Sequence, residues 1–430
     1  MKTSGILAAL LLGIMILCPP GACAEEQTFT GFRVKHVQTE TLADGITYSK
    51  YTLHSPDGNP RHGQKVNVLE VSRGARSGVR LLAVNSSVNI YKALKPLGTI
   101  LKQVREEIDD EILAAVNGDF FDICSGGSVG YLKTEDQWLV AGEFLEGWAV
   151  GMTNDGEPLI GQPKVSITLT LPDGTELPIN ALNGLRADTP WRETGPANVR
   201  ETRRDNQLVL FTPAYGSKTH IFGGGTEVSL VPDGEVTGEE ALTAVVEKVY
   251  RNLKKGGTSL KDGRMVLSGY GDAETALRAL KAGDAVVIRL TAGPPFDQSM
   301  IAIGGGRPDG GPLLMREGRP AEIVQAEDDP EVGEQFYRHH PRTVFAIRED
   351  GSYFLLAVEG NNDDAFGMTL EQTQAVLKDL GAYTAVNLDG GPSTTMAVRQ
   401  GEKLKVVTNT TGVKDRQTPV GSALILVRTE

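Results

Sequence analysis

The order in which helix and strand patterns follow one another constrains the fold of this chain most. Apolar residues at helical spacing predict an amphipathic helix over residues 96–110, and the apolar run 112–116 predicts a buried strand directly after it. The same order recurs near the C-terminus, where Thr369 opens a capping box, Gly381 ends the helix and residues 383–388 continue as a strand. Such units indicate helices packed on a sheet.

A third unit of this kind is expected in the middle of the chain. Thr237 and Glu240 match a capping box, and the apolar residues that follow them predict a helix that runs to Val249. A short helix over 272–281 and a strand over 284–290 complete the unit.

Strand patterns dominate residues 25–90 and return in the C-terminal part of the chain. Three early segments carry β-branched or aromatic residues between turn formers: 48–54, 66–71 and 79–84. Residues 344–347 and 353–358 flank the turn Glu349-Asp350-Gly351, which predicts a hairpin. With the helix units, these patterns predict the α+β class, a mixed sheet with several hairpins and packed helices rather than regular βαβ alternation.

The charge balance excludes one class of partner. The 430 residues include 43 Lys+Arg and 55 Asp+Glu, a net charge of −12, whereas nucleic-acid binding needs a basic surface. Hydrophobic content of 40% and charged content of 23% are typical of ordinary globular proteins. The acidic balance still permits a small anionic ligand that is held by one or two arginines.

The N-terminus has the pattern of a secretory signal peptide over residues 1–24. A positive start precedes the apolar stretch 6–17, and residues 22–24 supply the small side chains of a cleavage site. The stretch is short for a membrane span, so an N-terminal anchor is the weaker alternative, and Pro20 disfavours a lipoprotein at Cys23. The sequence therefore predicts an exported protein that is periplasmic, envelope-associated or secreted.

Removal of the signal would leave one of the three cysteines, Cys124. A single cysteine forms no internal disulfide, so the exported fold is expected to depend on packing alone. No later apolar stretch approaches the length of a membrane span.

Several catalytic patterns are absent from the sequence. It has neither a G-x-x-x-x-G-K-[ST] phosphate loop nor the zinc motif H-E-x-x-H, and its six histidines show no metal-ligand spacing, so no metal or cofactor is expected. Residues 126–130 match G-x-S-x-G around Ser128 but lack the strand before and helix after that a nucleophile elbow needs, which favours a turn. The acidic loop 359–364 lacks EF-hand spacing, so a solvated loop is favoured over a Ca²⁺ site.

Carboxylates lie beside glycines where two predicted strands end. Asp389 follows one strand and precedes Gly390 and Gly391, while Asp119 and Asp122 follow the strand 112–116. A sheet holds such side chains rigidly, and neighbouring glycines let a ligand approach backbone N–H donors that bind anions. Asp-Gly-Gly by itself is usually only a turn, but two such clusters indicate a site.

Two strings in the sequence carry a family resemblance. Residues 117–122 and, more specifically, residues 387–396 resemble motifs of the phosphodiester glycosidase family, and the resemblance runs in consistent order from about residue 65 to residue 430. Glu359 and Pro392 depart from the family's pattern. Further matches lie at Pro341-Arg342-Thr343, Gly367 to Leu370 and Gly304 to Gly306, with weaker ones at Asn183, Arg186, residues 208–215 and Arg416.

The resemblance implies hydrolysis of a sugar C1–O–phosphate bond, which releases a free sugar and a phosphomonoester. Such a site must hold an anion and place a carboxylate beside an oxocarbenium-like carbon. We expect Asp389 to act as base or nucleophile, with one of three acids as its partner: Asp119, Asp122 or Glu359. Arginine binds phosphate bidentately, which favours Arg342 first and Arg416 second. The other substrate-binding candidates are Asn117, Asn387, Gly390, Gly391, Ser393, Gly305 and Gly306.

Two other functions remain open at this point. A glycan-binding or exopolysaccharide-assembly protein would keep the fold without turnover, an alternative that the departures at Glu359 and Pro392 motivate. A metal-dependent phosphodiesterase would cut the other ester bond.

In the expected organisation, residues 1–24 are the signal peptide, 25–109 a β-rich N-terminal region with one helix, and 110–430 the catalytic domain. The expected partner is a glycan or sugar phosphodiester, without nucleic acid or a membrane span.

Overall fold

The computed structural model describes most of the chain after the N-terminal segment. The described residues are 28–429 except 56, 57, 60, 61, 93, 123, 124, 136, 143–146, 185–190, 193–198, 201–206, 221–223, 237–240, 254–256, 306–311, 324–337 and 414. The expected signal peptide, Cys124, Arg186, Gly306 and the capping box at Thr237 therefore lie outside them.

The protein is built mainly of β-strands, so the predicted α+β class with packed helices is wrong. Within the described residues, three sheets carry most of the structure, and a short pair, β14 (Trp191–Arg192) and β15 (Val199–Arg200), stands apart from them. Three short α-helices occur in the same residues: α1 (Leu97–Glu107), α2 (Asp272–Ala279) and α4 (Leu370–Asp379).

The first large sheet combines strands from both ends of the sequence through antiparallel pairs. β4 pairs with β25, so the N-terminal strands extend the C-terminal hairpin. The order in the described residues is β1 (Thr28–Phe29), β2 (Phe32–Ala43), β3 (Ile46–His54), β4 (Gln64–Val71), β25 (Tyr353–Val358), β24 (Arg342–Arg348), β26 (Ala382–Asn387), β22 (Leu313–Arg316) and β23 (Arg319–Pro320).

The second sheet likewise joins distant segments, because β29 near the C-terminus lies between two early strands. All its pairs are antiparallel. The order is β28 (Lys403–Val406), β27 (Met396–Gln400), β6 (Glu111–Asn117), β29 (Ser422–Arg428) and β5 (Val79–Asn85).

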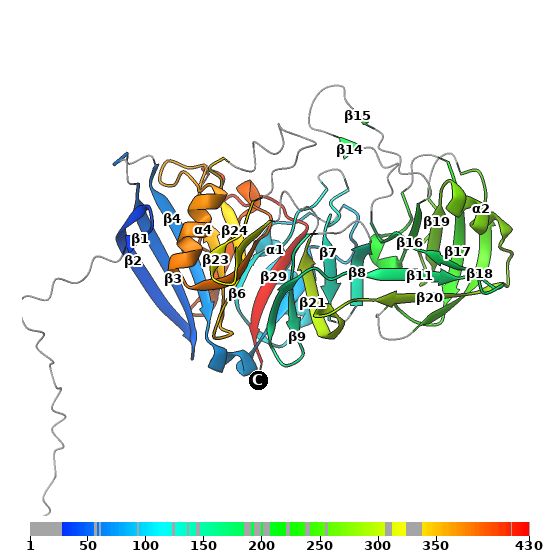
Figure 1. The fold of residues 1–430 in the computed structure, drawn as a ribbon, viewed down its shortest axis with the longest axis horizontal. Coiled ribbons are helices and arrows are strands. Elements are labelled where there is room, and N and C mark those ends of the chain that lie inside the picture. The colour runs from blue at the N-terminus through cyan, green and yellow to red at the C-terminus, as the bar shows by residue number, and fades with distance from the viewer. Residues whose placement is uncertain are drawn as a thin grey trace, which may run out of the picture.

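The third sheet runs through the centre of the molecule toward the end that carries α2 (Figure 1). Its order is β10 (Pro158–Gly161), β9 (Ala149–Thr153), β21 (Ser299–Gly304), β7 (Tyr131–Thr134), β8 (Gln137–Gly142), β13 (Ala181–Leu182), β16 (Leu208–Phe211), β19 (Met265–Gly269), β17 (Thr226–Pro232), β18 (Leu242–Tyr250), β20 (Ala285–Thr291), β11 (Ser166–Thr170) and β12 (Glu176–Pro178).

The segment predicted as a helix up to Val249 is strand β18, which corrects that expectation. Leu242, Ala244 and Val246 are buried while the intervening Val245 is 44% exposed, which is the period of two of a strand. The same apolar residues also satisfy helical spacing. Pairing with β17 on one side and β20 on the other decides between the two, because both neighbouring strands form backbone hydrogen bonds with the segment.

Several local predictions are confirmed. The predicted helices over 96–110 and 272–281 are α1 and α2, and the hairpin of β24 and β25 turns at residues 349–351. At α4, Gln372 N donates to Thr369 Oγ1 and Thr369 N donates to Gln372 Oε1, the reciprocal bonds of a capping box.

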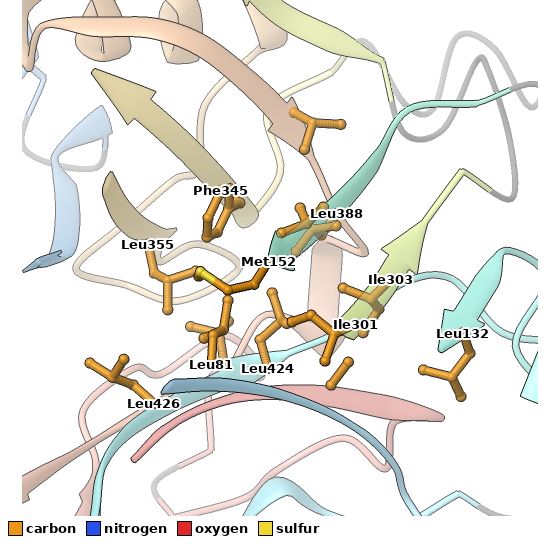
Figure 2. Close-up of a cluster of buried hydrophobic side chains, with 14 of the residues drawn as sticks. Leu81, Leu132, Met152, Ile301, Ile303, Phe345, Leu355, Leu388, Leu424 and Leu426 are labelled. Carbon is orange, nitrogen blue, oxygen red and sulfur yellow. The ribbon is translucent and has the colours of Figure 1, made fainter. Parts of the chain in front are cut away.

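One hydrophobic core lies where the three sheets meet (Figure 2). Phe345 and Leu355 enter it from the first sheet, Leu81 and Leu424 from the second, and Met152 from the third. The outer faces of the first two sheets are covered by α4 and α1. This arrangement brings the ends of β6 and β26, which belong to different sheets, to one place.

Candidate functional site

The loops that follow β6 and β26 are hydrogen-bonded to each other. Asp389 N donates to Gly118 O over 3.2 Å, and Leu388 N donates to Thr343 O on β24 over 2.8 Å. The two strand-end clusters identified in the sequence, 272 residues apart at Asn117 and Asp389, therefore form one structural unit.

Asn117 ties this unit together through a buried side chain. Its Nδ2 donates to Asp389 O at 2.7 Å and to Gly118 O at 3.2 Å. Its Oδ1 accepts from Thr343 Oγ1 at 2.8 Å and from Thr395 N at 3.0 Å. An amide is suited to this position because it donates and accepts at once. Asn117 thus positions the loop of Asp389, and its polar atoms are used for that purpose.

Asp389 is buried, and the pKa of its carboxyl is raised. Its side chain is 8% exposed, and burial raises the pKa of the carboxyl to about 8, with a further contribution from the charge of Asp119. Hydrogen bonds from the Ser393 hydroxyl and the Gly390 N–H oppose this rise in pKa. At neutral pH Asp389 is therefore mainly protonated.

Asp119 is buried beside it, with 2% of its surface exposed. The Asp119 N–H donates to Ser422 Oγ at 3.2 Å, and the Gly118 N–H donates to Ser422 O at 2.8 Å. A Cβ on Gly118 would lie 2.4 Å from Ser422 Oγ and 2.5 Å from Ile303 Cδ1, so any larger residue would require both side chains to move. These contacts hold the backbone of Gly118 and Asp119 against Ser422.

Asp119 and Asp389 are both buried, and the charge of Asp119 contributes to the raised pKa of Asp389. A buried carboxyl whose pKa is raised by burial and by a neighbouring acid is typical of sites for acid and base chemistry. Sequence reasoning selected both residues, but only the tertiary contact shows that they interact.

The Asp-Gly-Gly loop runs along the start of β24. Gly391 N donates to Pro341 O at 2.9 Å, and a short 3₁₀ turn, η5 (Gly391–Ser393), follows. Ser393, a candidate for substrate binding, is buried and its hydroxyl bonds to Asp389.

Arg342 is buried with its guanidinium directed at backbone carbonyls. Its Nε donates to Met368 O at 3.0 Å and its Nη2 donates to Arg338 O at 2.7 Å. Burial lowers the pKa of Arg342 to about 10, and the charge of Glu371 opposes that change. The group stays cationic at neutral pH, so it places a buried positive charge on the residue directly after Pro341, whose carbonyl accepts from Gly391 N.

Three aromatic rings next to Arg342 were not selected from the sequence. Phe366, which is 41% exposed, stacks on His62 at 4.9 Å between ring centroids and contacts His339 at 4.6 Å. Burial lowers the pKa of His339, and the charges of His62 and Arg342 lower it further. His62 is far away in the sequence, so no local pattern could have linked it to Phe366.

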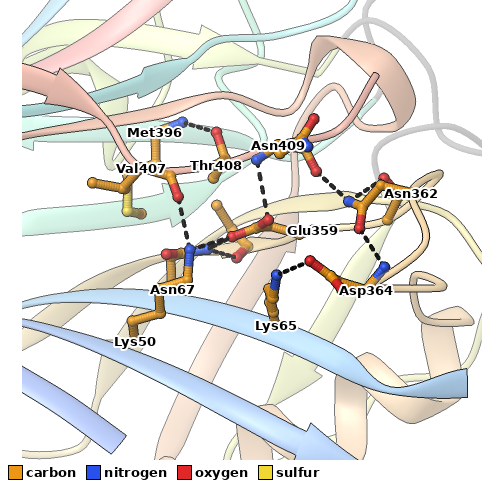
Figure 3. A network of polar contacts seen from close by, with 12 residues as sticks. Lys50, Lys65, Asn67, Glu359, Asn362, Asp364, Met396, Val407, Thr408 and Asn409 are labelled. Carbon is orange, nitrogen blue, oxygen red and sulfur yellow. Dashed lines mark hydrogen bonds and ion pairs between the residues drawn. The ribbon is translucent and has the colours of Figure 1, made fainter. Parts of the chain in front are cut away.

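Glu359 belongs to a separate polar network (Figure 3). Its Oε1 accepts from Lys50 Nζ at 2.6 Å and from Asn67 Nδ2 at 3.2 Å, while its Oε2 accepts from Asn409 N at 3.1 Å. The carboxylate is 2% exposed and joins β3, β4 and the loop after β28. Its lone pairs are thus used in structural contacts.

The acidic loop after Glu359 is also held by its own contacts. Lys65 Nζ pairs with Asp364 Oδ2 at 2.9 Å, and Asn362 Nδ2 donates to Asn409 O at 2.6 Å. In the part of the chain that the structure describes, no group of three or more His, Cys, Asp or Glu side chains is arranged to hold a metal ion.

Asp122 and Ser128 lie in the loop that connects β6 to β7. Asp122 Oδ1 accepts from Ser125 N, and Asp122 N donates to Gly127 O at 2.9 Å, so the side chain supports a turn. Ser128 Oγ donates to Gly130 O at 3.2 Å. Ser128 also forms an isolated β-bridge with Phe121 instead of the helix start that a nucleophile elbow requires.

The remaining candidates are placed as follows. Asn387 ends β26 with its Nδ2 donating to Leu388 O at 2.8 Å, and Gly305 follows β21, where its carbonyl accepts from Gly147 N at 3.2 Å. Arg416 has an exposed side chain, and Thr411 Oγ1 donates to its carbonyl at 3.5 Å. None of the described helices is long and apolar enough to cross a membrane.

Comparisons with solved structures give the fold. The chain superposes on a hypothetical protein from Synechocystis with a TM-score of 0.67 at 20% identity, covering 93% of this chain and 68% of that one. It superposes on a Burkholderia pseudomallei protein named "Putative exported protein" with a TM-score of 0.66 at 19% identity, covering 92% and 97%. Zebrafish N-acetylglucosamine-1-phosphodiester α-N-acetylglucosaminidase gives a TM-score of 0.44 at 12% identity over 92% and 88%. No curated protein matches the sequence.

A family comparison identifies the part of the chain that contains Asp389. The model of the phosphodiester glycosidase family matches residues 216–427, which include Arg342, Glu359 and Asp389. Asp119 precedes the matched residues, and the fold brings it to them. Over residues 216–427 the chain belongs to the phosphodiester glycosidase family.

Proposed function

We propose that this protein is a hydrolase that cleaves the sugar C1–O bond of a sugar 1-phosphodiester and releases a free sugar and a phosphomonoester. The observation that carries the proposal is the interacting pair Asp119 and Asp389, of which Asp389 keeps its proton at neutral pH. The family of residues 216–427 supports a glycosidase reaction.

In the proposed reaction the two acids have different roles. Water attacks C1 and loses a proton to the Asp119 carboxylate while the C1–O bond breaks, and the bonding electrons leave with the phosphate oxygen. Asp389 donates its proton to that oxygen. Solvent exchange then restores both groups. From the sequence alone, Asp389 was expected to act as base or nucleophile. Its raised pKa favours the role of acid instead.

The substrate-binding part of the proposal rests on charge and backbone geometry. The buried cation of Arg342 favours an anion near Gly390 and Gly391, although at least two of its N–H groups already donate to carbonyls. Arg416, whose side chain is exposed, is the second candidate for the phosphate. Phe366 offers an exposed ring on which a sugar can stack.

We also propose that the chain is exported after removal of residues 1–24, with residues 25–109 as a β-rich N-terminal region and 110–430 as the catalytic domain. The signal pattern and the name of the Burkholderia neighbour support export. Fractionation of cells that express the full chain, with N-terminal sequencing of the exported product, tests this proposal.

The reaction is tested with N-acetylglucosamine 1-(methyl phosphate), following free sugar and phosphorus products by NMR. Wild type should release free sugar and methyl phosphate, and Asp389→Asn and Asp119→Asn should each lose at least about 100-fold in kcat, the usual effect of removing a proton-transfer group. Asp364→Asn, an exposed carboxylate, is the matched control and should keep full activity. Equal rates in all variants would overturn the proposal.

The products also separate the other functions. Release of sugar 1-phosphate would mean that the other ester bond is cut, as in a phosphodiesterase. Measurable glycan affinity without any product over a panel of sugar phosphodiesters would favour a binding protein.

A further inference from the structure

Three rings stack beside the loop that carries Asp119 and Asp122. Tyr91 and His220 are nearly parallel, with centroids 3.8 Å apart and an interplanar angle of 14°. Tyr215 lies 5.7 Å from Tyr91 and 6.5 Å from His220. Tyr215 is buried, whereas Tyr91 and His220 each keep part of their surface in solvent. We call these three residues with Lys92 and Lys218 the Tyr91 cluster.

The backbone holds the Tyr91 cluster in place. Tyr91 N donates to Tyr215 O at 2.9 Å, which joins the chain after β5 to the 3₁₀ turn η3 (Pro213–Tyr215). Lys92 N donates to Ser125 O in the loop after β6. Lys92 and His220 both have left-handed backbones, with φ of 59° and 49°. Such conformations are uncommon for residues other than glycine, so the surrounding hydrogen bonds must hold both residues in place.

The Tyr91 cluster is basic in a protein whose net charge is −12. Lys92 Nζ lies 5.5 Å from the centroid of the Tyr91 ring, and the Lys92 and Lys218 side chains are exposed. Both lysines add to burial in lowering the pKa of His220, which shows that their charges converge on this ring. Burial raises the pKa of Tyr215, and the charges of Tyr91 and Asp122 raise it further, so Asp122 also acts on the cluster.

Aromatic faces and paired cations suit one class of ligand. A pyranose ring packs its C–H groups on an aromatic side chain, and ammonium groups attract a carboxylate or phosphate on the same sugar. Asp119 lies three residues before Asp122, so the cluster adjoins the loop that supplies the proposed base. Neither Tyr91 nor His220 has a role in the proposed reaction.

We propose that the Tyr91 cluster is a subsite for an anionic sugar of the glycan whose phosphodiester linkage is cleaved at Asp389. The subsite rests on the proposed function for its purpose. Its ligand is a hexose that carries a carboxylate or a phosphate, at a position beyond the bond that breaks. The subsite adds affinity for the glycan and takes no part in proton transfer.

Binding is measured by calorimetry on Asp389→Asn protein, which keeps the glycan intact. The probes are a galacturonate trisaccharide, its neutral methyl ester and a trisaccharide that carries a phosphate. The double variant Lys92→Gln/Lys218→Gln should bind the better of the two anionic probes at least tenfold more weakly than its parent. The neutral methyl ester should bind the parent tenfold more weakly than the galacturonate trisaccharide does. Tyr91→Leu should weaken binding of both, and added salt should weaken only the anionic probes.

The matched control is Lys102→Gln/Lys403→Gln, which changes the net charge equally at exposed positions elsewhere. It should bind within twofold of its parent. Equal affinities of the two double variants, or failure of both anionic probes to bind the parent, would overturn the subsite.

The two proposals fail in different ways. With the otherwise wild-type chain and N-acetylglucosamine 1-(methyl phosphate), the lysine variants should keep kcat/KM, since this small substrate does not reach the subsite. If wild type does not hydrolyse it but the lysine-dependent binding is present, the reaction is wrong and the subsite stands.

Discussion

The Asn117 side chain donates a 2.7 Å hydrogen bond to the backbone carbonyl of Asp389, across two sheets that contribute strands from opposite parts of the sequence. This bond, with those to Thr343 and Thr395, makes the position of the Asp389 loop depend on one buried amide. An asparagine that was expected to bind sugar thereby has a definite positioning role.

Asn117→Ala should lower the free energy of unfolding by about 3 kcal/mol, because it leaves several buried donors and acceptors without partners. Denaturant unfolding measures this change. Asn154→Ala, at an exposed turn, should stay within about 0.5 kcal/mol of wild type. An equally small effect at Asn117 would contradict the positioning role.

The hydrolysis rate should fall as the pH rises through about 8, where Asp389 loses its proton. The sign follows from its proposed role as acid, since only the protonated form donates; a base would give a rate that rises over the same interval. A pH profile of kcat/KM on the small phosphodiester distinguishes the two.

Asp389 should also make folding stability depend on pH. Its pKa in the folded protein lies above the ordinary value, so its contribution is fully present below about pH 4 and is lost as the pH rises through about 8. Asp389→Asn lacks this loss, so between pH 5 and pH 9 its free energy of unfolding should fall by about 4 kcal/mol less than that of wild type, given about 1.4 kcal/mol per pKa unit. Thermal unfolding at pH 5 and pH 9 measures the difference, and parallel pH curves for the two proteins would refute the assignment.

Glu359→Ala should cost about 3 kcal/mol of stability, since it leaves Lys50 without its buried partner and Asn67 and Asn409 without an acceptor. Asp364→Ala removes an exposed ion pair with Lys65 and should cost less than about 1 kcal/mol. In the folded Glu359→Ala protein, kcat/KM should still fall as the pH rises through about 8. If this fall disappears, Glu359 takes part in catalysis.

Gly367→Ala should destabilise the fold by about 2 kcal/mol or more, because a Cβ there would lie 2.6 Å from the carbonyl carbon of His340 on a backbone with φ of +97°. Gly263→Ala has a similar φ of +74° but no atom within 4 Å, so it isolates the backbone strain and should cost about 1 kcal/mol. Chemical denaturation gives the free energy of unfolding of both variants. The difference between their losses of stability measures the cost of the steric clash at Gly367.

Local structure was predicted well wherever neighbouring residues decide it. The capping box of Thr369 and Gln372, the amphipathic α1 and the hairpin at residues 349–351 depend on contacts within a few residues, which the sequence displays directly. The helix expected up to Val249 failed because its apolar residues satisfy two periods, and pairing with β17 and β20 selects the strand.

By itself, the sequence determined the strand-end carboxylates, the family motifs and the acidic charge balance. It did not choose among Asp119, Asp122 and Glu359 as the partner of Asp389, since all three are acids that follow predicted strands. The tertiary structure decided that Asp119 acts electrostatically on Asp389, that Lys50 and Asn67 hold Glu359, and that the fold is mainly β. The physical reason is that burial and charge coupling arise between segments that meet only after the sheets pack, and a linear pattern carries no record of which segments meet.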